Sequence, residues 1–452
     1  MKINPYIFRE YDIRGIVDKD FPEDLIINLG RALGTYYKEH NVGDITLGRD
    51  CRLSSPALHK WLIKGILSTG CSVLDTGICH TPLLYFSLFH LPVEGGVMIT
   101  GSHNPPDNNG FKICLGKSTI YGEEIQNIRK IMEEENFSSG NGRVTEIDIK
   151  PLYKEEILKR LEKGRRRLKV VIDAGNGTGG LLAPDIYRDL GMEVIELYCN
   201  MDGHFPFHHP DPTEVKNMKD LIKKVEETGA DLGIAFDGDA DRIGVVNEQG
   251  GIIWGDELMI LFSREILKEN PGASFIAEVK CSQTLFDDIE KHGGHPIMWK
   301  VGHSLIKKKL SEEGSLLAGE MSGHIFFAHR YFGFDDAVYA GGRVLEILSK
   351  TEQSLSKLLS DIPPTVNTPE IRFPCPEAIK FDIVKKIVEH FKKEYKVVDI
   401  DGARIIFPGG WALVRASNTQ PLLVMRFEGK TSEILDTIKK LVEEKVYSFF
   451  SR

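Results

Sequence analysis

The chain has 452 residues, and its 57 lysines and arginines are outnumbered by 66 aspartates and glutamates, which gives a formal net charge of −9. A composition that is 41% hydrophobic and 27% charged, without a biased tract, is typical of a globular protein and excludes a disordered or fibrous chain. The negative balance argues against a nucleic-acid binder or a protein of anionic membrane surfaces, because these partners need a broad cationic field. A small anionic ligand is not excluded, since it needs only a local cluster of cationic groups.

The seven cysteines are odd in number and include no Cys-x-x-Cys pair, which is typical of reduced thiols in a cytosolic protein. The N-terminal sequence reaches Pro5 and several charged residues before any apolar segment, so it predicts no secretory signal. No stretch approaches the roughly 18 uninterrupted apolar residues of a membrane helix. We therefore expect a cytoplasmic protein without a membrane partner.

The first 148 residues alternate helical and strand patterns and predict an α/β unit. Helices are expected at residues 24–39 and 123–135, and strands at 45–47 and 95–100. A cluster of turn-forming residues at 138–142 then marks a loop. These patterns place a domain boundary near residue 148.

Residues 149–250 predict a second α/β unit, and residues 251–365 predict a third. The second unit is expected to open with a helix that Gly164 ends in a left-handed cap. The expected elements of the two units are, in chain order, strands 168–173 and 194–198, helix 213–227, strands 232–246 and 252–254, helix 256–267, strand 275–279, helix 283–292 and strand 296–300. Because strands alternate with helices, the prediction is mixed parallel sheets with helices on their faces.

The pattern changes after Pro363 and Pro364, which cannot continue a helix and predict a linker at residues 362–369. The remaining residues, 366–452, place four consecutive strands between helices at 377–394 and 432–449. Runs of strands framed by helices indicate a separate α+β domain. The chain is therefore expected to fold as four units.

Three aspartates at alternating positions, Asp237, Asp239 and Asp241, give the strongest chemical signal in the chain. Three hard oxygen ligands on a short loop suit a divalent cation such as Mg²⁺ or Ca²⁺. A helix-flanked Ca²⁺ loop is excluded because its sixth position, which must be glycine, is Arg242, and because the flanking residues have strand patterns. The sequence therefore predicts a metal site between two strands, where a cation offsets the repulsion of the carboxylates.

Ser102 and His103 lie in a polar segment, residues 100–112, that follows an expected strand. Two prolines make this loop rigid, and Lys112 adds local positive charge. A Ser-His pair in a turn sequence is a weak signal by itself. The loop nevertheless has the composition to hold a nucleophilic or phosphorylated serine.

Two further loops have the composition of ligand sites. Residues 415–421 combine Arg415 with hydroxyl and amide side chains between two strands, which suits a phosphate group. Residues 319–324 place acidic, hydroxyl and imidazole side chains at a strand end, where α/β sheets hold ligand-contacting loops. The glycine-rich residues 173–180 lack a nucleotide-binding motif and predict only a strand-to-helix turn.

Together these segments resemble the α-D-phosphohexomutase family, and most closely its bacterial phosphomannomutase/phosphoglucomutase branch. The resemblance follows the chain in order through residues 11–15, 48–50, 100–112, 237–242, 302–304, 319–324 and 415–421. It implies four domains around a central cleft, three of α/β type and a C-terminal α+β domain, in agreement with the four predicted units.

The resemblance implies that Ser102 carries a phosphoryl group and that Asp237, Asp239 and Asp241 bind Mg²⁺ together with a phosphoserine oxygen. The phosphoserine would phosphorylate a hexose 1-phosphate, and the resulting hexose 1,6-bisphosphate would turn in the cleft and return its other phosphate to the serine. Cationic groups would stabilise the phosphoryl group in its loose transition state. The implied catalytic residues are Ser102, His103, Lys112, Arg242 and His324, and the implied substrate contacts are Tyr11, Arg14, Lys280, His303, Glu320, Ser322, Arg415, Ser417, Asn418 and Thr419.

The general acid/base is left open among His324, His103 and Lys112. An imidazole titrates near neutral pH, and a lysine among other cations is expected to have a lowered pKa. We favour His324, with assistance from Lys112.

The expected activity is the Mg²⁺-dependent interconversion of the 1- and 6-phosphates of mannose, glucose or both. A phosphoglucosamine mutase and an inert sugar-phosphate-binding protein of the same fold are the alternatives, and Met321 favours glucose and mannose over glucosamine. Phe207 and Gln420 depart from the residues common in the family, but neither is an expected ligand. The oligomeric state is left open, with a monomer favoured.

Overall fold

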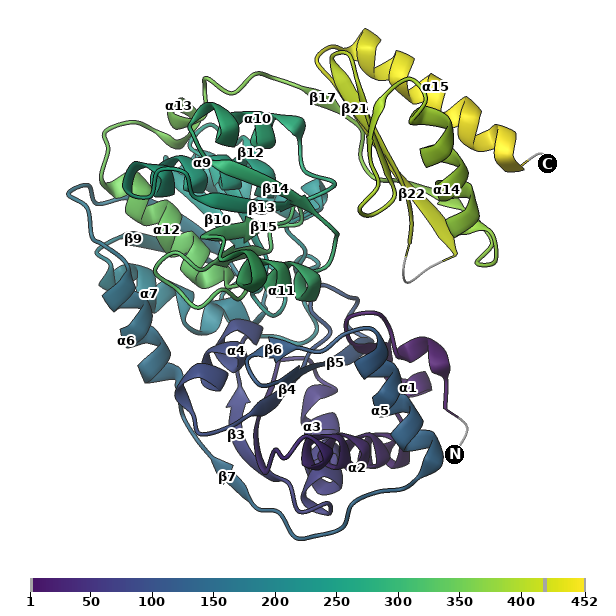
Figure 1. Ribbon diagram of the computed structural model, residues 1–452. Helices are drawn as coiled ribbons and strands as arrows, with labels where there is room; N and C mark the ends of the chain where they lie inside the picture. The colour runs from purple at the N-terminus through teal and green to yellow at the C-terminus, as the bar shows by residue number, and fades with distance from the viewer. Residues whose placement is uncertain (1–2, 418–420, 451–452) are drawn as a thin grey trace.

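The computed structural model describes residues 3–417 and 421–450. The chain forms four sheets, each with helices packed on it (Figure 1). Each sheet uses one continuous stretch of the chain, with strands β1–β7, β8–β12, β13–β16 and β17–β22. Figure 1 shows the second and third units in teal and green next to each other, the first unit in purple and blue below them, and the yellow-green C-terminal unit to one side. Among the described residues, no helix is both long and apolar enough to cross a membrane.

The first sheet has the strand order β1-β5-β4-β2-β3-β7, and β6 pairs with β5. β2 runs parallel to β3 and β4, whereas β5 runs antiparallel to β1 and β4. Its strands are β1 (Ile13–Ile16), β2 (Asp44–Arg49), β3 (Ser72–Ile78), β4 (Gly95–Ile99), β5 (Asn108–Leu115), β6 (Ser118–Thr119) and β7 (Val144–Glu146). Its helices are η1 (Pro5–Ile7), α1 (Val17–Asp20), α2 (Glu23–Glu39), α3 (Ser55–Leu67), α4 (Thr81–His90) and α5 (Glu123–Glu134).

Helices α2 and α3 cross in close contact on this sheet because each has a glycine at the crossing point. A Cβ atom on Gly30 would lie 2.4 Å from the Leu62 carbonyl oxygen, and one on Gly65 would lie 2.1 Å from the Ile27 carbonyl oxygen. Glycine lets the backbones approach, and the apolar stripe of α2 then fills the core of the unit.

The second and third sheets have the strand orders β12-β11-β10-β8-β9 and β14-β13-β15-β16, and both mix parallel and antiparallel pairs. Their strands are β8 (Lys169–Asp173), β9 (Glu193–Leu197), β10 (Leu232–Phe236), β11 (Ile243–Asn247), β12 (Ile252–Ile253), β13 (Ser274–Glu278), β14 (His295–Trp299), β15 (Leu317–Gly319) and β16 (Ile325–Phe327). Their helices are α6 (Lys150–Arg160), η2 (Thr178–Leu181), α7 (Ala183–Asp189), η3 (Val215–Met218), α8 (Lys219–Thr228), α9 (Gly255–Glu269), α10 (Gln283–Lys291), α11 (His303–Glu313), α12 (Ala337–Ser349) and α13 (Leu355–Leu358). All residues of α12 are buried, and one apolar core continues through both units.

Three details of the second unit differ from the sequence expectations. Residues 232–246 form two strands, β10 and β11, which pair antiparallel. The helix expected from residue 213 begins as a 3₁₀ turn, and the strand at 252–253 extends the second sheet by pairing with β11 instead of opening the third unit. The turn between β10 and β11 contains the three aspartates that were expected between two strands, and the other two differences arise at element boundaries, where local patterns are least specific.

Gly164 does not form the expected left-handed cap. Helix α6 ends at Arg160, and the next residue, Leu161, is already extended with φ −101° and ψ 136°. A Cβ atom on Gly164 would lie 2.2 Å from the Ser349 carbonyl oxygen, so glycine is needed here for close approach to the end of α12.

The C-terminal unit is an antiparallel sheet with strand order β17-β22-β21-β20-β19, with β18 paired to β22. Its elements are β17 (Val366–Asn367), β18 (Ile371–Pro374), α14 (Lys380–Phe391), β19 (Lys396–Val398), β20 (Ala403–Phe407), β21 (Gly410–Ala416), β22 (Leu422–Gly429) and α15 (Ser432–Phe450). β17 lies inside the expected linker, which is therefore shorter than predicted. The two helices pack on the sheet and enclose a separate apolar core.

Candidate active site

The serine loop, residues 100–107, leaves the buried strand β4 and returns as β5, so the first sheet anchors both of its ends. The buried Arg52 holds the loop from within. Its guanidinium donates to the carbonyl oxygens of Ser102 (2.7 Å), Asn104 (2.6 Å), Pro105 (2.5 Å) and Asn108 (3.0 Å). Asp50 lies 3.2 Å from the same guanidinium and accepts a hydrogen bond from the Gly101 N–H.

Ser102 is held in a constrained position at the tip of this network. Its φ of +49° lies in the left-handed region, which few residues other than glycine adopt. Its hydroxyl donates to the Asp237 carboxylate at 2.8 Å, and its Oγ lies 3.1 Å from Nδ1 of His103. Burial, together with the charge of Arg242, holds the pKa of His103 well below its usual value, so this imidazole is neutral at neutral pH.

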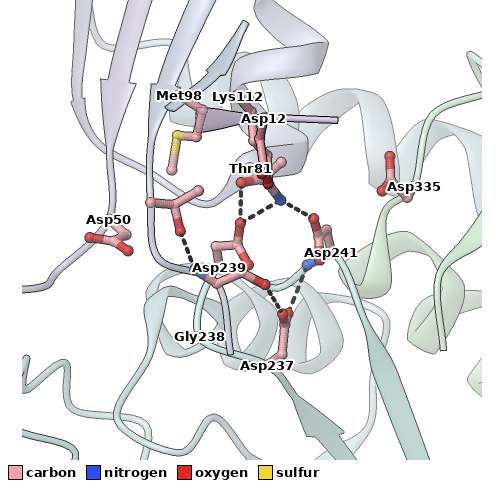
Figure 2. A network of polar contacts seen from close by, with 12 residues as sticks. Asp12, Asp50, Thr81, Met98, Lys112, Asp237, Gly238, Asp239, Asp241 and Asp335 are labelled. Carbon is pink, nitrogen blue, oxygen red and sulfur yellow. Dashed lines mark hydrogen bonds and ion pairs between the residues drawn. The ribbon is translucent and has the colours of Figure 1, made fainter. Parts of the chain in front are cut away.

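The acid loop, residues 237–242, is the turn between β10 and β11. Both strands are buried along their whole length, so Asp237, Asp239 and Asp241 are fully buried as well. One oxygen of each carboxylate lies within 4.8 Å of the others. Figure 2 shows Thr81 donating to Asp239, at 2.5 Å, and the ammonium of Lys112 lying between Asp239 and Asp241.

The three carboxylates of the acid loop lie close enough together for each to affect the ionisation of the others. Burial and the neighbouring charges of Asp239 and Asp241 raise the pKa of Asp237 well above its usual value. Among the described residues, Oδ1 of Asp239 and Oδ1 of Asp241 have no hydrogen-bond partner. Three buried carboxylates, two of them with an unpartnered oxygen, suit a hard divalent cation, so the residues present fit the expected metal.

Lys112 does not have the lowered pKa that the sequence suggested. Burial disfavours its charged form, but the carboxylates of Asp239 and Asp241 outweigh burial and raise the pKa of Lys112 above its usual value. The reason is that the nearest charges are acidic rather than basic, with Asp239 2.8 Å from Nζ. In this arrangement Lys112 is a fixed positive charge.

His324 lies at the start of β16 and meets the acid loop from the third unit. The Gly323 carbonyl oxygen accepts a hydrogen bond from the Ile243 N–H at 3.0 Å, which ties the two loops together. Arg242 Nε then donates to Nε2 of His324 at 2.9 Å. On its other side, Nδ1 of His324 lies 3.0 Å from the carboxylate of Asp335.

Asp335 is a buried site residue without a motif of its own in the sequence. Its carboxylate lies 3.0 Å from Nζ of Lys307 and 4.0 Å from Nδ1 of His303. Burial opposes its ionisation, but Lys307 and His324 lower the pKa of Asp335 well below its usual value. Burial also lowers the pKa of His303, whose ring stacks near that of His324.

The expected sugar contacts gather around Gly302. Glu320 accepts a hydrogen bond from the Gly302 N–H at 2.8 Å, and Ser322 donates to the other carboxylate oxygen of Glu320 at 3.0 Å. Tyr11 donates to the Val301 carbonyl oxygen at 2.9 Å. Gly302 has φ +127°, and a Cβ there would lie 2.5 Å from the Tyr11 ring, so this meeting of the first and third units needs glycine.

The cationic residues expected to contact the substrate are each paired with an acid. Arg14 pairs with Asp12 at 2.5 Å, Lys280 with Glu370 at 3.0 Å, and Arg415 with Asp401 at 3.1 Å. The Ser417 carbonyl oxygen accepts a hydrogen bond from Lys380. Asn418 and Thr419 lie outside the described residues.

The structure brings most of the expected residues into one connected region. Hydrogen bonds and ion pairs link Ser102, His103, Lys112, Arg242, His324 and the three aspartates. His303 connects them to Tyr11, which adjoins the turn bound by Glu320. Lys280 and Arg415 lie instead where the third and fourth units meet. The glycine-rich residues 173–180 form a turn as expected, and Gly177 packs against Gly238 of the acid loop.

Sequence profiles of the phosphoglucomutase/phosphomannomutase family match the chain in four consecutive segments. They are the α/β/α domain I at residues 5–139, the α/β/α domain II at 151–251, the α/β/α domain III at 254–366 and the C-terminal domain at 370–445. The phosphomannomutase/phosphoglucomutase of Pseudomonas aeruginosa is 47% identical over 434 residues, which cover 96% of this chain and 94% of that protein. The phosphoglucomutase of Neisseria gonorrhoeae is 45% identical over 438 residues, which cover 96% of this chain and 95% of that protein.

Similarity in three dimensions extends over the same length. The crystal structure of a phosphoglucomutase/phosphomannomutase family protein from Burkholderia thailandensis has a TM-score of 0.92 and 40% sequence identity to this chain, and the match covers 99% of this chain and 98% of that chain. The family profiles and these relatives together match all four units of the fold. The chain therefore belongs to the phosphoglucomutase/phosphomannomutase family of α-D-phosphohexomutases and is a sugar-phosphate mutase.

Proposed function

We propose that this mutase interconverts the 1- and 6-phosphates of mannose, glucose or both through a phosphoserine at Ser102 and a hexose 1,6-bisphosphate. The observation that carries the proposal is the 2.8 Å contact between the Ser102 hydroxyl and Asp237 of the acid loop. It joins a constrained serine to three buried carboxylates and to the cationic side chains of Lys112 and Arg242. Phosphoryl transfer depends mainly on such positioning and charge stabilisation.

The proposed cofactor is Mg²⁺, held by Asp237, Asp239 and Asp241 together with an oxygen on Ser102. Unpartnered, buried carboxylate oxygens support this assignment. The bound ion would supply positive charge next to the phosphoryl group.

The remaining side chains have separate proposed roles in charge stabilisation, proton transfer and substrate binding. Arg14, Lys112 and Arg242 provide fixed positive charge beside the serine, because each is buried close to the acid loop. His324 is the proposed acid/base, with the neutral His103 as the alternative. Substrate would bind in the predicted central cleft, with Glu320 and Ser322 on the sugar hydroxyls. Tyr11, Lys280, His303, Arg415, Ser417, Asn418 and Thr419 are proposed as further contacts with the sugar phosphate.

Paired assays on mannose 1-phosphate and glucose 1-phosphate test the proposal, with Mg²⁺ and a trace of bisphosphate activator. Turnover of either sugar supports it, and preference for glucosamine phosphate would assign the amino-sugar activity instead. Binding of glucose 1,6-bisphosphate without turnover, by protein phosphorylated on Ser102, would leave only a sugar-phosphate-binding role.

Replacing the nucleophile gives the sharpest prediction for this proposal. Ser102→Ala should lower kcat by at least about 10⁴-fold, because no other hydroxyl of the described residues contacts Asp237 to take up the phosphoryl group. Intact-mass measurement should find phosphate on the wild-type protein and none on the variant. Full activity of Ser102→Ala would reject the phosphoserine.

We also propose domain boundaries near residues 148, 254 and 366, with the second boundary moved past β12 because this strand belongs to the second sheet. A cytoplasmic monomer that binds neither nucleic acid nor membranes is proposed as well. The seven free cysteines are typical of a cytoplasmic protein, and the negative net charge argues against nucleic-acid and membrane partners. Sedimentation at several protein concentrations would test the monomer.

A further inference from the structure

Asp335 and His324 are held together by backbone pairing at the start of α12. Residue 335 pairs with Phe326 in an isolated antiparallel bridge, and the Asp336 N–H donates to the Ile325 carbonyl oxygen. The bridge places the carboxylate of Asp335 beside the imidazole of His324, although ten residues lie between them in the chain. Asp335 is fully buried and His324 is 3% exposed, so water does not compete for this contact.

The neighbours of His324 define which ring nitrogen carries the proton. Arg242 Nε can only donate, so Nε2 of His324 accepts this bond with its electron pair and carries no hydrogen. In the neutral ring the hydrogen is then on Nδ1, which lies 3.0 Å from Oδ2 of Asp335 and 3.7 Å from Oδ1 of Asp241. Oδ2 of Asp335 is therefore the nearest carboxylate oxygen to the Nδ1 hydrogen.

Other charges around Asp335 keep it available for this role. Lys307 contacts its second oxygen, Oδ1, at 3.0 Å, which leaves Oδ2 directed toward His324. Among the described residues, neither Oδ2 of Asp335 nor Nδ1 of His324 has a well-aligned hydrogen-bond partner, so the two atoms, 3.0 Å apart, are available to each other. Figure 2 shows Asp335 on the same side of the acid loop as Asp241, outside the three aspartates proposed to bind metal.

We propose that Asp335 is a positioning residue that fixes the ring orientation and the Nδ1–H tautomer of His324, so that Nε2 is presented as the proton acceptor beside Arg242. The inference rests on the proposed function. In that reaction the sugar oxygen bonds to the phosphorus on Ser102, the bond from phosphorus to Oγ breaks, and Oγ keeps the electron pair. Nε2 of His324 exchanges the hydrogen bond from Arg242 for one from the sugar hydroxyl, takes the hydroxyl proton and returns it to the departing sugar oxygen in the second transfer.

The substitution Asp335→Asn separates positioning from packing, because asparagine has nearly the same size. Its amide can donate to Nδ1, which would favour the opposite tautomer with hydrogen on Nε2, facing the Arg242 donor. We expect kcat to fall by about 10²- to 10⁴-fold with KM changed by less than about threefold. The loss should be similar for mannose and glucose phosphates, since the contact involves the catalytic ring and not the sugar.

Asp336→Asn is the matched control. Asp336 is the adjacent buried acid, but it caps α12 and accepts from Tyr153 and Tyr331, without contact to His324. This variant should lose stability while its kcat, measured on the folded fraction, stays within about threefold of wild type. Equal losses of kcat in both variants would overturn the proposal, because they would indicate general damage to the fold.

Nuclear magnetic resonance of ¹⁵N-histidine-labelled protein tests the tautomer independently of activity. The His324 signals are assigned by their loss in His324→Gln, and the wild-type ring should carry its hydrogen on Nδ1. Hydrogen on Nε2 in the wild type, or an unchanged kcat in Asp335→Asn, would overturn the positioning role. If the wild-type protein has no mutase activity, the proposed function fails, and the tautomer result still decides whether Asp335 orients His324.

Discussion

Glu278 is a buried acid beside the sugar-binding loop, and its proton is linked to folding. One carboxylate oxygen accepts from the Met321 N–H at 3.0 Å, and Lys280 lies 3.6 Å away. Burial is the largest influence and raises the pKa of Glu278 to about 8, with Lys280 opposing it and Glu320 adding to it. Between its ordinary pKa and about pH 8, the folded protein therefore keeps a proton that the unfolded chain has lost.

This linkage predicts a pH dependence with a definite sign. Because the unfolded state binds fewer protons, the free energy of unfolding should fall as pH rises through this window, by at most about 1.4 kcal/mol per pH unit. Glu278→Gln keeps an acceptor for Met321 and removes the titration. Urea unfolding at pH 6, 7 and 8 should therefore show the variant gaining stability relative to wild type as pH rises. The exposed control Glu133→Gln should show the same pH dependence of the free energy of unfolding as wild type. The same pH dependence in Glu278→Gln would contradict the assignment.

At this scale the sequence was informative where a residue belongs to a motif. Ser102 and the three aspartates could be predicted because their chemistry is concentrated in short segments. Arg52 and Asp335 could not, since each acts through partners that only the folded loop brings near: four carbonyl groups for Arg52, and an imidazole across a β-bridge for Asp335. The prediction that the pKa of Lys112 is lowered was wrong for the same reason, because the acidic neighbours of Lys112 lie more than 100 residues away in the sequence.

The ends of the strands hold the loops that form the candidate active site. The serine loop and the acid loop are both turns between buried antiparallel strands, β4–β5 and β10–β11, and they meet where Gly238 packs against the Ser102 carbonyl oxygen. Strand patterns predicted that both loops would lie at strand ends. They could not predict that the loops would touch, because that depends on how the first and second units pack.

Arg52 is the side chain that gives the serine loop its shape, so its replacement should affect the loop as a unit. Arg52→Lys keeps the charge, but one ammonium cannot reach four carbonyl groups in the plane that the guanidinium covers. We expect kcat to fall by about 10²-fold, because small displacements of a reacting group are costly. The free energy of unfolding should fall by about 2–4 kcal/mol, since buried carbonyls lose their partners.

Steady-state kinetics and urea unfolding of Arg52→Lys test this together. Arg188→Lys is the control, because Arg188 is exposed on α7 and pairs only with surface acids. A variant at position 52 with wild-type kcat would show that other contacts hold the loop.

At the scale of the whole molecule, the C-terminal unit docks on the third unit through buried polar contacts. Arg404 of β20 donates to the Val279 and Cys281 carbonyl oxygens at 2.6 and 2.7 Å and stacks 4.0 Å from the Trp411 ring. Burial lowers the pKa of Arg404 to about 10, which leaves it charged at neutral pH. Arg426 donates to the Lys280 carbonyl oxygen at 2.7 Å. Composition and strand patterns predicted a separate unit here, but they contained no signal for this docking.

Because Lys280 and Arg415 lie at this junction, the docking should control substrate binding. Arg404→Met fills a similar volume but leaves the two carbonyl oxygens unpaired. We expect KM for sugar phosphates to rise about tenfold or more, with Ser102 phosphorylation unchanged, since the serine loop lies in another unit. Small-angle scattering should show a larger radius of gyration, and proteolysis should become faster between residues 362 and 369.

The control Lys392→Met removes an exposed cation of the same unit, which pairs with Asp399, and should change none of these quantities. If Arg404→Met kept the wild-type KM while its radius of gyration increased, the phosphate contacts assigned to Lys280 and Arg415 would have to be given up, because the substrate would then bind without the C-terminal unit in place.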